Sequence, residues 1–98
     1  MVASGGTIDR AQRALRLAAD AQKAGRTAEA RRHYHDVLTI DAHNVVALNG
    51  LGMVALRSGD CGAATWFRRA IQADATSTVL WLNLASAFRS EEHTSELQ

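Results

Sequence analysis

The sequence has no proline, only one cysteine among its 98 residues, and only 5% aromatic side chains. Its single cysteine, Cys61, cannot form an internal disulfide, which favours a reducing compartment such as the cytoplasm. Lysine and arginine (11) nearly balance aspartate and glutamate (10), which argues against nucleic acid or a membrane surface as the partner. No apolar run approaches the roughly 18 residues of a membrane-spanning helix.

A repeat is the main positive feature of the sequence. Alanine supplies much of the 47% apolar fraction, which favours closely packed helices over a sheet. Leu17 recurs as Leu51 and again as Leu84, and Gly25 recurs as Gly59. The period of about 34 residues is typical of stacked helical hairpins. The sequence therefore predicts an all-α fold, an α-solenoid of antiparallel helix–turn–helix hairpins with about two and a half repeats.

Each repeat should contain two helices separated by a glycine. Apolar residues at three- and four-residue spacing predict a first helix over about 9–24, which Gly25 should end in the left-handed conformation. Thr27 is expected to cap the second helix, which should end near residue 40. These spacings predict a disordered N-terminus at 1–8 and an array over 9–88, with repeats at about 11–44 and 45–77 and a partial one at 78–88.

The second repeat should follow the same plan with one residue fewer. Helices are expected at about 45–58 and 62–73, and Asp60 should cap the helix at 62–73. The first helix of the third, partial repeat should run from 78 to about 88. The missing residue should lie within 59–66, where one turn or helix start is tighter.

The packing positions resemble the tetratricopeptide (TPR) signature, W-x2-L-G-x2-Y followed by A-x3-F. The last repeat matches its first half at Trp81, Leu84, Ala85 and Phe88, with alanine in place of glycine. The resemblance covers about residues 11–88. It implies that the first helices line a concave groove that binds peptides.

The resemblance also implies which residues face the groove. These are Gln12, Leu15, Ala19, Gln22, Lys23, Val46, Asn49, Met53, Leu56, Arg57, Val79, Leu82, Asn83 and Ser86. The six large apolar residues among them predict a partly apolar groove, although some could instead pack between successive first helices. Asn83 occupies the slot of a ligand-binding asparagine in long arrays of the family, whereas Asn49 lies one residue early. The clamp that holds chaperone C-terminal carboxylates is not matched.

The remaining candidates for chemistry have simpler interpretations. His33 and His35 point to opposite sides of a helix and cannot share a metal ion, so we interpret them as solvated histidines. Cys61 is expected to be a buried or half-buried structural thiol. The arginine pairs 31–32 and 68–69 are interpreted as solvated charges on the convex face. We therefore predict no catalytic residue, no metal and no cofactor in this chain.

The last ten residues, RSEEHTSELQ (89–98), break the periodicity. They match letter for letter the in-frame translation of a widely used short-read sequencing adapter. We therefore expect a non-native tail on a truncated chain. Without a second helix after Phe88, the C-terminal helix should remain uncapped and prone to self-association.

The function expected from these features is a protein-interaction module of a bacterial cytoplasmic protein that holds a peptide or protein segment in its groove. The alternative is the N-terminal arm of a longer bacterial enzyme, because the repeats look similar to arrays that precede aspartyl/asparaginyl β-hydroxylase or sulfotransferase domains. RNA binding would need a more basic groove than Lys23 and Arg57 provide.

Overall fold

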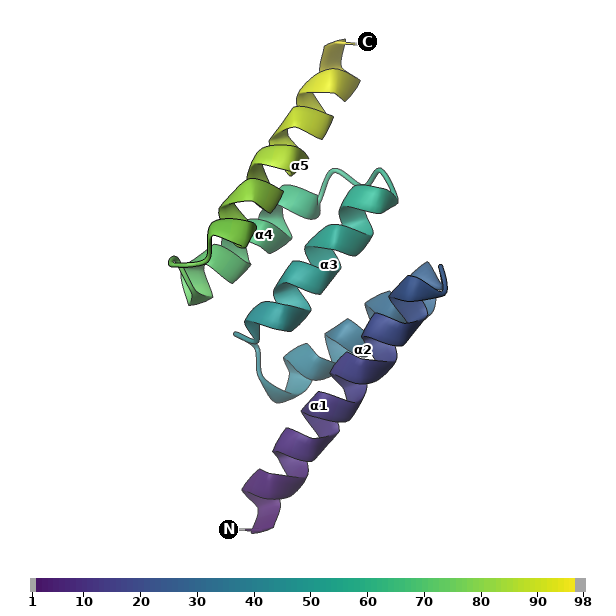
Figure 1. The fold of residues 1–98 in the computed structure, drawn as a ribbon, viewed down its shortest axis with the longest axis vertical. Coiled ribbons are helices and arrows are strands. Elements are labelled where there is room, and N and C mark those ends of the chain that lie inside the picture. Colours follow the sequence, from purple (N-terminus) through teal and green to yellow (C-terminus); the bar gives the residue numbers. More distant parts are fainter. Residues whose placement is uncertain (1, 97–98) are drawn as a thin grey trace.

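The computed structural model describes the backbone of residues 2–96 and the side chains of residues 6 and 9–89. Within that stretch it consists of five α-helices and no strand. The helices are α1 (Val2–Lys23), α2 (Thr27–Ile40), α3 (Val45–Arg57), α4 (Ala63–Ala73) and α5 (Thr78–Glu96). α1 packs on α2 and α3 on α4 as hairpins, and α5 packs on α4 without a second helix of its own (Figure 1). The predicted α-solenoid of helical hairpins is confirmed.

The two hairpin turns begin with the same backbone motif. Gly25 has φ of 80° and Gly59 has φ of 73°, the left-handed region that glycine adopts without a steric penalty. In each turn, the N–H of the residue after the glycine donates to the carbonyl five residues earlier, at 2.8 Å. This pattern satisfies carbonyls at the helix end, as in a Schellman motif. The glycine stops predicted from the sequence are therefore present at both positions.

The turns differ after the glycine. Gly25 and Gly59 are 34 residues apart, whereas the buried Ala30 and its equivalent in the second repeat, Ala63, are 33 residues apart. The missing residue therefore lies between Gly59 and Ala63, inside the predicted stretch. There the chain forms an extra turn, in which the Gly62 N–H donates to Oδ1 of Asp60 at 2.9 Å. As a result, α4 lacks the first turn that α2 has.

Two of the predicted helix caps are wrong. Thr27 is the first residue of α2, whose N-cap is Arg26 and has no side-chain hydrogen bond. Asp60 does not cap α4 either, because the extra turn places Gly62 at the N-cap. The sequence missed Asn44, whose side chain caps α3 by accepting from the backbone N–H three residues on, at 3.0 Å.

Both ends of the helical array extend beyond the predicted limits. α1 begins at Val2 rather than near residue 9, so residues 2–8 are helical in the structure. α5 continues to Glu96 rather than ending near residue 88. Residues 89–96 contain neither glycine nor proline and include the good helix formers Arg and Glu, so nothing in them stops the helix. Residues 1, 97 and 98 of the two expected terminal segments lie outside the described residues.

Two clusters of buried residues form the core, each shared by a hairpin and the next first-helix. The first core layer joins α1, α2 and α3 and contains Ala14, Ala18, Ala21, Ala30, Tyr34, Val37, Ala47, Leu51 and Val54. The second core layer joins α3, α4 and α5 and contains Leu48, Ala55, Ala63, Ala64, Phe67, Ala70, Ile71, Leu80, Leu84 and Ala87. Because α3 contributes to both layers, it is the most buried helix and connects the two hairpins.

Two glycines let large rings approach the backbone of α3. A Cβ atom at Gly50 would overlap the ring of Tyr34, and one at Gly52 would overlap the ring of Phe67. The first ring comes from α2 and the second from α4, so each hairpin places one aromatic side chain against α3. Gly50 and Gly52 are therefore packing positions, as their place in the middle of a helix predicts.

Candidate binding groove

The first helix of each repeat lies on one side of the solenoid. The backbone of α3 lies close to those of both α1 and α5, whereas the backbones of α2 and α4 are farther apart and these two helices meet through the side chains of His35 and Trp66. The second helices are therefore spread apart on the outer side, and α1, α3 and α5 line the inner side (Figure 1). We call the surface of these three helices that carries the fourteen predicted groove residues the inner groove.

Three apolar residues of the inner groove are well exposed. Val46 lies on α3, and Val79 and Leu82 lie on the neighbouring α5. Their exposed fractions are between 59% and 62%. Apolar side chains with this exposure on adjacent helices provide a surface that an apolar ligand side chain could cover.

Other apolar residues of the inner groove also belong to the protein interior. Leu15 is half-buried and packs against the first core layer. Met53 and Leu56 are half-buried and pack against the second core layer. Because Met53 and Leu56 contact the core as well as the groove, charged side chains at these positions should lower stability as well as change the groove.

Hydrogen bonds fix two polar parts of the inner groove. Nδ2 of Asn83 on α5 donates to Oδ1 of Asn49 on α3 at 2.7 Å. The hydroxyl of Tyr34 donates to Oε1 of Gln22 on α1 at 2.7 Å. Burial of Tyr34 raises the pKa of its hydroxyl above the ordinary value of 10.0. The sequence missed both pairs, although the separation of the two asparagines by one repeat could have indicated the first.

The part of the inner groove where α1 and α3 end is basic. A pocket of about 450 Å³ is lined by Ala19, Gln22, Lys23 and Arg57. Lys23 is in the last turn of α1, and Arg57 is in the last turn of α3. All four lining residues are among the predicted groove residues. The remaining two, Gln12 and Ser86, are exposed on α1 and α5.

Another pocket, of about 420 Å³, lies outside the inner groove, at the free face of the first hairpin. Its lining residues are Arg10, Arg13, Ala14, Leu17, His33, Asp36, Thr39 and Ile40. His33 is half-buried there, with Nδ1 3.9 Å from Oδ2 of Asp36. His35 points elsewhere and packs edge-on against Trp66, with ring centroids 5.5 Å apart. The two histidines are thus separated, as the helix geometry predicts.

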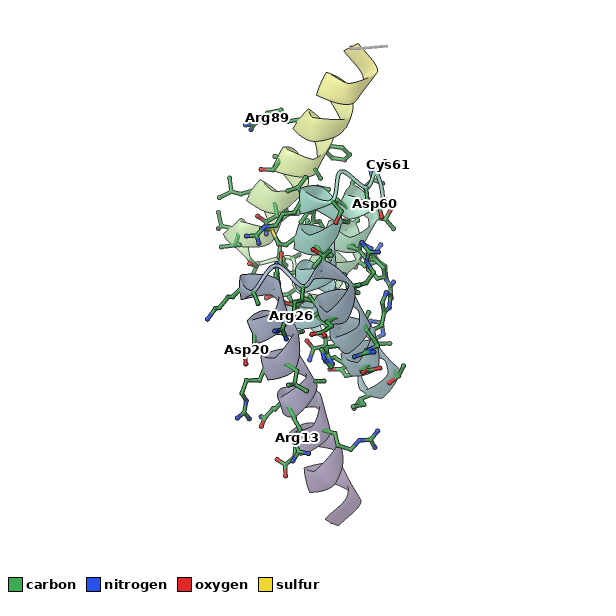
Figure 2. The ribbon with its side chains drawn as sticks, turned by 90° about the vertical axis from the view of Figure 1, so that its right-hand side faces the viewer. Arg13, Asp20, Arg26, Asp60, Cys61 and Arg89 are labelled. Carbon is green, nitrogen blue, oxygen red and sulfur yellow. The ribbon has the colours of Figure 1, made fainter. Side chains whose placement is uncertain are left out.

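Two expectations about residues outside the inner groove need correction. Cys61 is exposed rather than buried, because it lies in the extra turn between α3 and α4 (Figure 2). Arg68 and Arg69 are exposed but are not simply solvated. Arg68 lies 5.0 Å from the ring centroid of Phe88, and Arg69 lies 5.0 Å from that of Trp66. Both arginines therefore cover aromatic faces.

The fold and the inner groove define an α-solenoid of helical hairpins. Comparison with known proteins finds bacterial proteins of similar sequence. No family model matches the chain. Over 78 residues, or 79% of its length, the chain is 33% identical to cellulose synthase operon protein C of Komagataeibacter xylinus. It is 32% identical to the protein of the same name in Komagataeibacter sucrofermentans. The chain spans only 6% of the length of these curated relatives. Among the described residues, no helix is long and apolar enough to cross a membrane.

Proposed function

We propose that this chain is a TPR array that acts as a protein-interaction module and binds a peptide or protein segment in the inner groove. The observation that carries the proposal is the exposure of Val46, Val79 and Leu82 on adjacent first helices. These side chains lie on the same three helices as the asparagine pair and the basic pocket. An extended peptide would bury its apolar side chains against these residues, and its backbone would form hydrogen bonds with the polar side chains of the inner groove.

The comparisons support an interaction role within a larger bacterial protein. The relatives are proteins of a cellulose synthase operon, by name, and the chain matches only a small part of each. We propose that the segment serves a protein of that kind by holding a partner rather than by catalysis. The alternative, a repeat arm of a longer enzyme, requires a catalytic domain beyond this chain. Sequencing the genomic region around this reading frame decides between them.

The groove can be tested with an array of immobilised heptapeptides of random sequence. The test variant is Val46→Asp/Leu82→Asp, and the matched control is Leu17→Asp, which changes an exposed leucine outside the inner groove. Peptides selected by the wild type should bind the double variant at least about tenfold more weakly, because charged groups replace the apolar contacts. Fluorescence anisotropy measures the affinities.

The control variant should bind the selected peptides within about twofold of the wild type. Thermal melting followed by circular dichroism should show that both variants remain folded, because the substituted side chains are well exposed and belong to neither core layer. Equal weakening by Leu17→Asp, or unchanged binding by the double variant, would place the ligand outside the inner groove.

A further inference from the structure

The two cationic residues of the basic pocket occupy equivalent positions in successive repeats. Lys23 and Arg57 are one repeat apart and occupy the same position at the ends of α1 and α3. They line one pocket together with Ala19 and Gln22.

The long polar side chains of this pocket offer hydrogen-bond donors. Lysine and arginine side chains can only donate. The carbonyl oxygen of Gln22 accepts from the Tyr34 hydroxyl at 2.7 Å, which orients the amide and leaves its NH₂ group as the free end. Because the Tyr34 ring is buried in the first core layer, this orientation is held by the fold. Donors from two positively charged groups and one neutral group are therefore gathered at one place.

No carboxylate of the described side chains neutralises this pocket. Its lining contains no acidic residue. Asp20, one turn before Lys23, is exposed and is not part of the lining. Neither cation forms an ion pair with a carboxylate among the described side chains, where the pairs are Arg26 with Glu29 and His33 with Asp36. The pocket therefore complements an anionic ligand group.

We propose that this pocket binds the side-chain carboxylate of an aspartate or glutamate in the peptide held by the inner groove. This inference rests on the proposed function. Arg57 is on the middle first-helix, and the inner groove continues past it onto α5. A bound chain therefore passes the pocket, which favours an internal acidic residue over a chain terminus. Acidic and apolar residues together would then determine which segments bind.

The same two cations also have a structural effect that the experiment must separate. Positive charges in the last turn of a helix stabilise the negative end of its dipole. Removing them should lower the melting temperature slightly whether or not a ligand binds. The preference for an acidic residue in the ligand is the property that helix stabilisation alone does not give.

The test compares the wild type with Lys23→Gln/Arg57→Gln on the heptapeptide array, with each peptide attached through its C-terminus. The control is Arg31→Gln/Arg32→Gln, which removes the same charge from exposed positions on α2. Wild type and control should select peptides with an Asp or Glu beside apolar residues. Replacing that Glu by Gln should weaken wild-type binding about tenfold, as expected for loss of a charge-assisted hydrogen bond, and should weaken binding to the pocket variant less than about twofold.

Each other result has a definite meaning. Selection of apolar peptides without an acidic preference would overturn the carboxylate inference and leave groove binding intact. A Glu→Gln loss that is equal in the pocket variant would place the carboxylate elsewhere and also overturn the inference. Preference for a free C-terminus, measured on a second array attached through the N-terminus, would overturn the assignment to a side chain. Absence of any selected peptide would overturn both proposals.

Discussion

The two core layers follow one repeat pattern but place different aromatic residues against α3. In the first layer Tyr34 lies over Gly50 and its hydroxyl reaches Gln22 in the inner groove. In the second layer Phe67 lies over Gly52 and is completely buried. Tyr34 therefore connects the first layer to the groove by a hydrogen bond, whereas Phe67 has no polar group and contributes apolar packing alone.

The first helices of the three repeats also differ in how much of their surface a preceding hairpin covers. Leu17, Leu51 and Leu84 occupy the same repeat position, yet their exposed fractions are 46%, 2% and 9%. Leu51 and Leu84 each pack against the preceding hairpin, while Leu17 has no such hairpin among the described residues. Burial in this solenoid therefore depends on position in the array as much as on residue type, as expected when repeats are stabilised by their neighbours.

The largest effect is expected from Phe67→Ala in the second layer. Deleting a fully buried phenylalanine costs about 3–5 kcal/mol, because apolar contacts are lost and a cavity remains. For a chain of this size that is a large part of the total stability. Urea unfolding followed by circular dichroism measures the change. Phe88→Ala, at an exposed position on α5 outside the two core layers, is the control and should cost much less. Equal losses would mean that α5 is covered more completely than the structure indicates.

Gly52→Ala should have the next largest effect. The added methyl group would overlap the Phe67 ring, and overpacking of this kind costs about 1–3 kcal/mol. Combining it with Phe67→Leu should restore part of the loss, because the smaller side chain makes room near α3. A double-mutant cycle of unfolding free energies measures the coupling. Additive effects would show that the ring does not limit the approach of α4 to α3.

A smaller effect is expected from Tyr34→Phe, which gives the first layer the chemistry of the second. Loss of the hydrogen bond to Gln22 should cost about 0.5–1.5 kcal/mol near pH 7. Because burial raises the folded-state pKa of Tyr34, its contribution should be fully present below about pH 10 and lost as pH rises through that raised pKa. The free energy of unfolding, measured between pH 8 and about 11, should therefore decrease less steeply with pH for the variant than for the wild type. An unchanged pH slope would contradict burial of the hydroxyl.

The repeat and its helices could be predicted because their signals are local or periodic. Gly25 and Gly59 stop helices through their own backbone freedom, and leucines that recur once in each repeat define the packed face. The positions of α2, α3 and α4 follow within a few residues. The fourteen groove residues follow the same periodicity onto α1, α3 and α5, and their role in binding stays a prediction.

The features that were missed depend on contacts between repeats or on irregular backbone. Asn49 and Asn83 looked out of register because the leucines are one residue closer together, yet the two amides meet across α3 and α5. Cys61 was expected to be buried or half-buried, but the missing residue places it in an exposed turn. Half-burial of Met53 likewise depends on how closely α5 approaches α3. No single segment of the sequence contains this information.

The smallest effect is expected from Leu17→Ala, which tests the dependence of burial on array position. Leu17 is nearly half exposed, so truncation should cost about 1 kcal/mol or less, whereas Leu51→Ala at the equivalent buried position should cost about 2–5 kcal/mol. Urea unfolding of both variants measures the difference. If a hairpin is fused before α1 so that it covers Leu17, the cost of Leu17→Ala should rise toward that of Leu51→Ala. A large cost for Leu17→Ala in the chain as it stands would mean that another surface already covers this leucine, and the contrast between the end and the middle of the array would then fail.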